Sequence, residues 1–169
     1  MNQQSTLPDP QSAIPNPHDG IRVKGFFRLH IVADTGEIVS DSGWRENQIA
    51  NDGFDQYLAK ALGAISGSKQ VSHMAIGSGT VPGAAATSLH GEVVKRASVT
   101  AASSSSSKAV RFTATFDSAN SFVTNTQNIS NVGLFNSSAT GTLFAGNTYA
   151  SSSVATNQSV YATYDITFS

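Results

Sequence analysis

Two stretches of the chain alternate strictly between apolar and polar residues, which is the pattern of a β-strand with one face in a core. Residues 109–116 show this alternation first, and residues 160–168 repeat it near the end of the chain. The apolar positions are Val110, Phe112, Ala114 and Phe116, then Val160, Ala162, Tyr164, Ile166 and Phe168. We therefore predict two strands whose apolar faces both line the core.

Further strands are predicted where aromatic and β-branched residues lie between turn-forming residues. These stretches are residues 25–32, 37–44, 73–80, 92–101, 128–136 and 142–149. The first two flank the short turn ADTG and should pair as a hairpin. The seven or eight strands, joined by turn-rich loops, indicate an antiparallel arrangement.

Residues 128–149 predict a second hairpin, whose polar tip NSSATG is flanked by two Leu-Phe pairs. Adjacent residues of a strand point to opposite faces, so Leu134 and Phe135 diverge, as do Leu143 and Phe144. Both faces of this hairpin are therefore apolar, and both need a cover. We interpret the second cover as another subunit.

One substantial helix is predicted near residues 51–62. Asn51 or Asp52 can cap its start, and Gly63 can end it. The apolar positions at helical spacing, which should face the core, are Phe54, Leu58, Ala61 and Leu62.

Residues 1–20 hold four of the five prolines among Asn, Gln, Ser and Asp, a composition that buries too little apolar surface to fold alone. We predict an extended N-terminal arm that binds a partner, anchored to the β domain through Arg22, Lys24, Phe26 and Phe27. The predicted partner-binding residues are Leu7, Pro8, Pro10, Ile14, Pro15, Pro17, Phe26 and Phe27.

Together these elements predict a mainly β chain: a single-domain antiparallel β-sandwich or jelly roll over residues 21–169, with one short helix and the arm. The length of 169 residues and the hydrophobic content of 39% suit one core. Only 12% of the residues are charged and the net charge is −1, which argues against nucleic acid and anionic membranes as partners. No stretch approaches the roughly 20 apolar residues of a membrane span.

Catalytic, cofactor-binding and metal-binding residues are not predicted. The four histidines are scattered, and His30 belongs to the polar face of its strand. The chain has no cysteine, and none of its many serines carries a local signature of a nucleophile. The glycine turn at residues 77–79 lacks the lysine and the following helix of a phosphate-binding loop.

Four motifs occur in order along residues 47–168. An Asn-x-Ile-x-Asn-x-Gly start of the helix precedes a Gly-x-Gly-Thr loop, in ENQIANDGFDQYLAKALG and HMAIGSGTVPGAAATSLHGEVVKR. A Leu-x-x-Glu-Val-x-x-Arg segment follows, made by Leu89, Glu92, Val93 and Arg96. The last motif is a Gly-Leu-Phe-Asn strand that turns back through a Leu-Phe strand, in NVGLFNSSATGTLFAGNTY. In this order the motifs resemble those of small structural proteins of tailed-bacteriophage virions.

The resemblance implies a non-enzymatic part of the virion. The expected function is capsid decoration, in which the arm and the β domain bind the major capsid protein at the particle surface. The alternative is a tail-fibre, neck or tail attachment protein, and a third, weaker reading is a lectin or carbohydrate-active enzyme. Repetition of weak contacts favours a homo-oligomer, and a trimer suits local three-fold axes.

Overall fold

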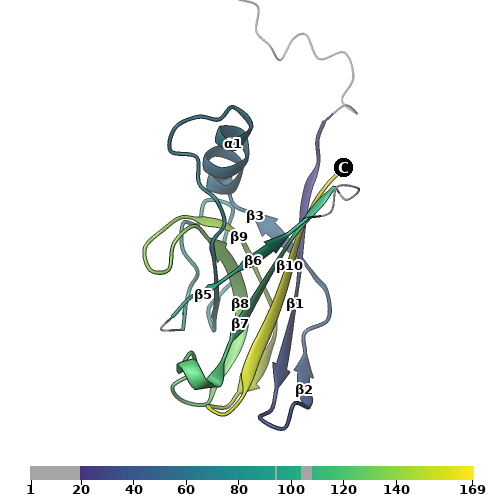
Figure 1. Cartoon of the computed structure of the whole chain (residues 1–169), viewed down its shortest axis with the longest axis vertical. Helices are drawn as coiled ribbons and strands as arrows, with labels where there is room; N and C mark the ends of the chain where they lie inside the picture. The colour runs from purple at the N-terminus through teal and green to yellow at the C-terminus, as the bar shows by residue number, and fades with distance from the viewer. Residues whose placement is uncertain (1–19, 94, 104–107) are drawn as a thin grey trace, which may run out of the picture.

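The computed structural model describes residues 20–93, 95–103 and 108–169 (Figure 1). Ten strands make up about half of these residues. They are β1 (Val23–Val32), β2 (Ile38–Asp41), β3 (Arg45–Ile49), β4 (His73–Gly77), β5 (Ala97–Ser98), β6 (Thr100–Ala102), β7 (Ala109–Phe116), β8 (Gln127–Phe135), β9 (Leu143–Val154) and β10 (Ser159–Phe168). The helical elements are η2 (Gly53–Ala59), α1 (Lys60–Leu62) and η3 (Ser118–Asn120).

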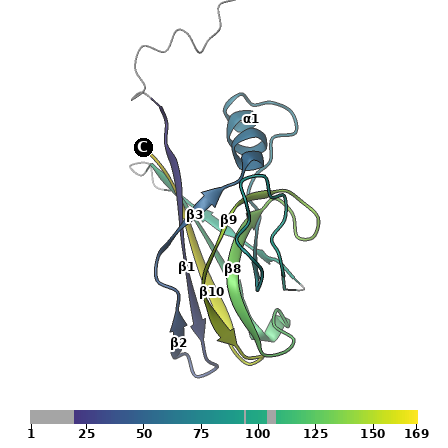
Figure 2. The ribbon, with the colours of Figure 1, turned by 180° about the vertical axis from the view of Figure 1, so that it is seen from behind.

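The strands form one antiparallel sheet in the order β5-β4-β8-β9-β3-β1-β10-β7-β6, with β2 added beside β1. The sheet folds into two layers, and β3 passes from one layer to the other (Figures 1 and 2). The first part of β3, at Arg45–Asn47, pairs with β1, whereas Gln48 and Ile49 pair with β9. The predicted fold class is therefore confirmed: a mainly β, sandwich-like single domain that is nearly closed into a barrel.

The second junction between the layers is made by residues 97–102. At its start this segment pairs with β4, through Met74 opposite Ala97, and at its end with β7, through Thr113 opposite Thr100. The prediction of one strand over residues 92–101 is thus only partly correct. Two short strands form instead, because the chain changes partners around Val99, whose N–H bonds to the carbonyl of Ser72 at 3.0 Å.

The core confirms the two alternating patterns. On β10 and β7 the predicted inward residues lie opposite one another, as Tyr164 does Phe112, and they are buried or nearly so. The first strand adds Phe27, Leu29 and Ile31, which are at most 1% exposed. Each such large side chain contributes about 1.5–3 kcal/mol when it leaves water, so this shared face is the main source of stability.

The outer face of the β8–β9 hairpin is covered by the chain itself. Phe135 and Leu143 point away from the main core and pack with Leu89 and Ala86 in a second, smaller cluster. The backbone fixes this cover, since Leu143 N–H bonds to the carbonyl of Thr87 at 3.1 Å. The interpretation that another subunit covers this face was therefore wrong. The loop over residues 78–93 of the same chain folds back across the hairpin and covers this face.

A pair of charged side chains closes the same cover. The guanidinium of Arg96 donates to both carboxylate oxygens of Glu92 at 2.8 and 2.9 Å. It also donates to the carbonyl of Ser137 at 3.1 Å and lies over the Phe135 ring, 3.5 Å from its centroid. The Arg96 side chain is only 7% exposed, so these contacts replace its lost hydration.

The helix occupies residues 51–62 as predicted, but it presents a different face to the core. Its central part, η2, is π-helical, and its buried residues are Gly53 and Tyr57. Phe54 is 46% exposed, Leu62 is 90% exposed and Ala61 is exposed as well, so the predicted inward stripe is wrong at three of its four positions. The wider turn of a π-helix shifts the angular spacing that the α-helical pattern assumed. The side chain of Asp52 does not cap the helix but accepts a bond from Gln56 at 3.0 Å.

Candidate functional site

Six of the eight predicted partner-binding residues lie outside the described residues. They are Leu7, Pro8, Pro10, Ile14, Pro15 and Pro17. Phe26 is half-buried on the outer face of β1. Phe27 is not available to a partner, because its side chain is 0% exposed and its ring stacks on that of Tyr164, with 6.0 Å between centroids. The alternation of β1 allows only one of two adjacent phenylalanines to face outward.

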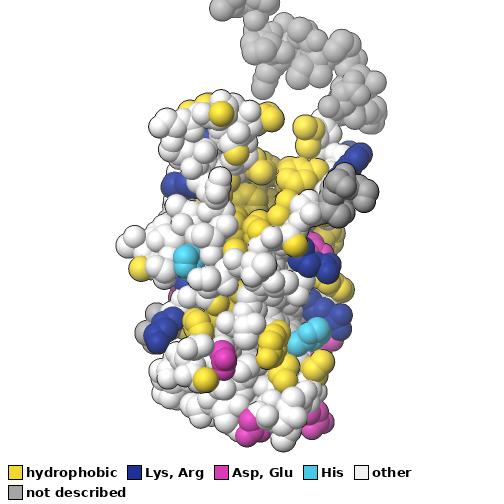
Figure 3. Space-filling view, in the orientation of Figure 1, with side chains coloured by type: hydrophobic (Ala, Val, Ile, Leu, Met, Phe, Trp, Pro, Cys, Tyr) yellow, Lys and Arg dark blue, Asp and Glu magenta, His cyan; other side chains and the backbone are white. Residues whose placement is uncertain are grey.

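An apolar hollow lies at the end of the barrel where the helix, the start of β1 and the end of β10 meet. Figure 3 shows hydrophobic side chains gathered there, below the helix and beside the first described residues. We call this hollow the end groove and define it by Ile21, Val23, Phe54, Leu58, Leu62 and Phe168. Its volume is about 670 Å³. A deeper cavity of about 390 Å³ shares Leu58 and Phe168 with the groove and reaches the rings of Tyr57, Phe112 and Phe144.

The end groove exposes large apolar side chains to water. Leu62 is 90% exposed, Ile21 is 78% exposed and Phe54 is 46% exposed. Ile65, just beyond the helix, is 54% exposed. Scattered apolar residues are ordinary on a protein surface, but a contiguous concave group of them marks a site of interaction. This group is therefore the candidate functional site.

Hydrogen bonds hold both walls of the groove in place. Arg22 and Ser169 exchange two backbone hydrogen bonds, at 2.7 and 3.0 Å, and so keep the start of β1 beside the end of β10. On the other wall the hydroxyl of Tyr57 donates to the carbonyl of Thr142, and its ring meets Phe144 edge-on at 5.1 Å. Burial raises the pKa of Tyr57 well above its usual value, so this phenol stays a neutral donor.

The charged side chains that line the groove and its adjoining cavities are of one sign. Lys69 lies beside the deeper cavity, and Lys108 lies beside a third cavity of about 400 Å³ that also touches Ile21 and Phe168. No carboxylate side chain is among the described residues that line these three cavities. The lining of the end groove is thus entirely apolar, and each of the two adjoining cavities adds one lysine.

Elsewhere, two aspartates are held in ion pairs with arginines. Arg28 donates to Asp41, and Arg111 donates to Asp165 through Nε and Nη2, each at 2.7 Å. The hydrogen bond from Arg28 holds the pKa of Asp41 well below its usual range. Within the described ranges, no three His, Cys, Asp or Glu side chains are placed together to hold a metal ion. Both pairs are partly exposed at the surface, and none of their residues lines the end groove.

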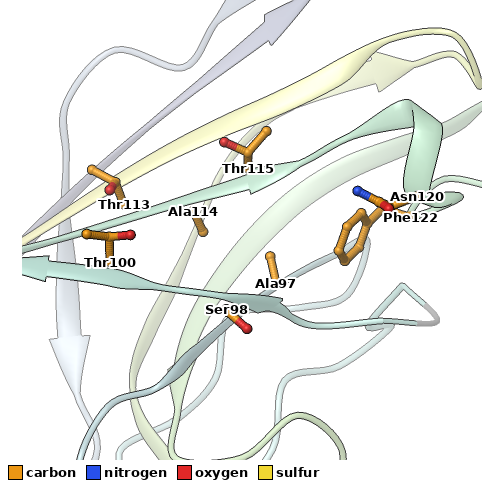
Figure 4. Close-up of a pocket in the computed structure, with 8 residues that line it drawn as sticks. All are labelled: Ala97, Ser98, Thr100, Thr113, Ala114, Thr115, Asn120 and Phe122. Atoms are coloured by element: carbon orange, nitrogen blue, oxygen red, sulfur yellow. The ribbon is translucent and has the colours of Figure 1, made fainter.

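A separate polar hollow, of about 350 Å³, lies between β5, β6 and β7 (Figure 4). Thr100 and Thr113 face each other across adjacent strands, and Ser98, Thr115 and the amide of Asn120 add further hydrogen-bonding groups. Its lining has no charged side chain among the described residues. Hydroxyls without a base or an acid offer contacts to a neutral polar ligand but no means of activating a nucleophile.

Comparisons with protein families, with curated proteins and with solved structures gave no match. Among the described helices, none has both the length and the apolar character needed to cross a bilayer. The end groove itself was missed by sequence reasoning. Its signal was present as the four-residue spacing of Phe54, Leu58 and Leu62, but that stripe was assigned to the core rather than to the surface.

Proposed function

We propose that this chain is a non-enzymatic structural protein of a tailed-phage virion, a decoration protein that binds the major capsid protein at the particle surface. The observation that carries the proposal is the end groove. The groove is a solvent-exposed apolar surface where residue 20 leads into the β domain, and it is therefore next to the predicted arm. Such a surface suits permanent assembly, because its apolar side chains gain free energy only when another surface covers them.

Two further properties support a role in contact. Charged residues make up only 12% of the chain, so neighbouring copies repel one another weakly. The ordered motifs of residues 47–168 resemble those of virion proteins, and they fall on elements that shape one compact unit. Glu92 and Arg96 of the third motif form the ion pair that closes the hairpin cover. When many copies are arranged in an array, weak contacts between each copy and the shell add up to stable attachment.

Co-sedimentation with capsids tests this proposal. The full chain should sediment with purified capsids of its phage, and a chain lacking residues 1–20 should remain folded by circular dichroism yet stay in the supernatant. A control variant, Val81→Asp, changes an exposed apolar residue outside the end groove and should bind as the full chain does. Wild-type occupancy by the truncated chain would contradict the role of the arm, and absence of binding by the full chain would contradict the capsid proposal.

Copy number separates capsid decoration from the alternative, attachment in the tail, neck or fibre. Quantitative mass spectrometry of intact particles should find hundreds of copies on a shell, against about a dozen or fewer at a tail or neck position. A value at the lower level would move the protein to the tail. The polar hollow beside β7 would then become a natural place to seek receptor contacts.

A further inference from the structure

We propose that the end groove binds the N-terminal segment, residues 1–19, of a second copy of this chain, so that copies associate by exchanging arms. The inference goes beyond the proposed function, because it assigns the end groove to contact between copies of this chain. The described chain begins at Gly20, and the next residue, Ile21, already lines the groove. Residues 1–19 thus join the described chain directly beside the groove.

The composition of this segment complements the groove. Its apolar residues include Leu7 and Ile14, which are suited to a hollow lined by aliphatic and aromatic side chains. The segment contains no Lys or Arg, and its charged residues are Asp9 and Asp19. Lys69 and Lys108 line the two cavities that adjoin the groove, so the nearest charged side chains in these linings are opposite in sign to the two aspartates.

The point at which the chain enters the β domain favours a second copy over the segment's own groove. Gly20 directly precedes Ile21, which lines the groove. To enter its own groove, the segment would have to reverse direction within a few residues of Ile21. A segment supplied by a second copy can enter the same groove without that reversal.

Reciprocal exchange would use both members of each contact. Every copy supplies one arm and one groove, so two copies can satisfy each other, and a ring of copies can pass arms in one direction. In either arrangement the exposed side chains of Leu62, Phe54 and Ile21 become covered. The fold of the β domain need not change, because the groove is already formed in the single chain.

Cysteine cross-linking tests the occupant directly, since the natural sequence has no cysteine. A full chain with Ile14→Cys and Ala61→Cys, treated with a short bis-maleimide, should give covalent dimers and larger species on a denaturing gel. A chain with Ile14→Cys and Val81→Cys is the control and should remain monomeric. Cross-links within single chains only would overturn the exchange in favour of the chain's own groove. Absence of cross-links would overturn the arm as the occupant.

Complementation gives an independent readout. The full-length variants Ile14→Asp and Leu62→Asp should each associate about tenfold or more weakly than wild type in sedimentation velocity, because each buries a charge in an apolar contact. Mixed in equal amounts they should form a heterodimer, since one supplies an intact arm and the other an intact groove. Failure of the mixture to associate would overturn exchange. Leu62 is 90% exposed, so its substitution should leave the circular dichroism spectrum unchanged.

The two proposals fail differently. Copies that cross-link but do not sediment with capsids would contradict the decoration function and leave arm exchange standing. Copies that sediment with capsids without cross-linking to each other would contradict arm exchange and leave the decoration function standing.

Discussion

Gly53→Ala should destabilise the protein, which is the reverse of the usual effect of replacing a helical glycine. Alanine in place of glycine inside a helix ordinarily gains about 0.5–1 kcal/mol. At Gly53, however, a Cβ would lie 2.2 Å from the carbonyl oxygen of Phe144 and 2.9 Å from a side-chain methyl of Ile49. That carbonyl also accepts the N–H of Ala50 at 3.0 Å, so it cannot simply move away.

The expected magnitude follows from these opposing terms. Overpacking of this kind costs about 1–3 kcal/mol, and the propensity gain offsets part of it, so the net loss in the free energy of unfolding should be about 1–2 kcal/mol. For a domain of this size the midpoint of thermal unfolding should fall by about 2–8 °C. Urea titration and thermal melting, both followed by far-ultraviolet circular dichroism, measure the two quantities.

The matched control is Gly63→Ala at the end of the same helix. There the nearest atoms to a new Cβ are side-chain carbons of Ile65, at 3.1 and 3.3 Å, and that side chain is 54% exposed and free to move. The change in unfolding free energy should stay within about 0.5 kcal/mol. If Gly53→Ala were as stable as wild type or more so, the helix would not be seated on the hairpin, and the wall of the end groove would be misplaced.

Two more substitutions test the charged pairs. Glu92→Gln should lower the free energy of unfolding by about 2–4 kcal/mol, because it removes the charge that faces the buried Arg96 guanidinium. Asp165→Asn should cost less than about 1 kcal/mol in the same urea titration, because its partner Arg111 is 54% exposed and water can solvate it. Equal losses would contradict the different burial of the two arginines. Asp41 has a lowered pKa, so its ion pair contributes stability above about pH 4 that is lost as the pH falls. The stability difference between wild type and Asp41→Asn should therefore be at most about 1 kcal/mol at pH 6 and shrink by pH 2.5, and a difference that grows in acid would refute this sign.

Local patterns predicted the parts of the fold that depend on one strand and its own core face. The alternation in β7 and β10 placed Phe112 and Tyr164 correctly, because period two is the same whatever the neighbouring strand. The same alternation in β1 would have placed Phe27 in the core, because Phe27 lies on the same face as Leu29. The assignment of that side chain to a partner came from aromatic content rather than from position along the strand.

What could not be predicted depends on long-range choices. Nothing local to Val99 marks the point where the chain leaves β4 for β7, because the choice is made by two strands that are remote in sequence. The end groove depends on which side of a π-helix meets the hairpin, and Gly53 decides this through close approach to Phe144. The loop that covers Phe135 is likewise set by contacts between segments roughly fifty residues apart.

The segment over residues 97–102 has a consequence for how the protein behaves at high density. An open sheet ends in two rows of unpaired N–H and C=O groups, each a template onto which another molecule can add a strand. Here β5 and β6 belong to one short segment, which pairs with β4 at its start and with β7 at its end. The segment thus connects the two ends of the sheet. If this segment detached, the edges of β4 and β7 would be exposed together. Strands from other molecules could then add to both edges, and fibres could grow. While the segment stays paired, fewer backbone groups along this seam are free to bind a strand from a crowded neighbour.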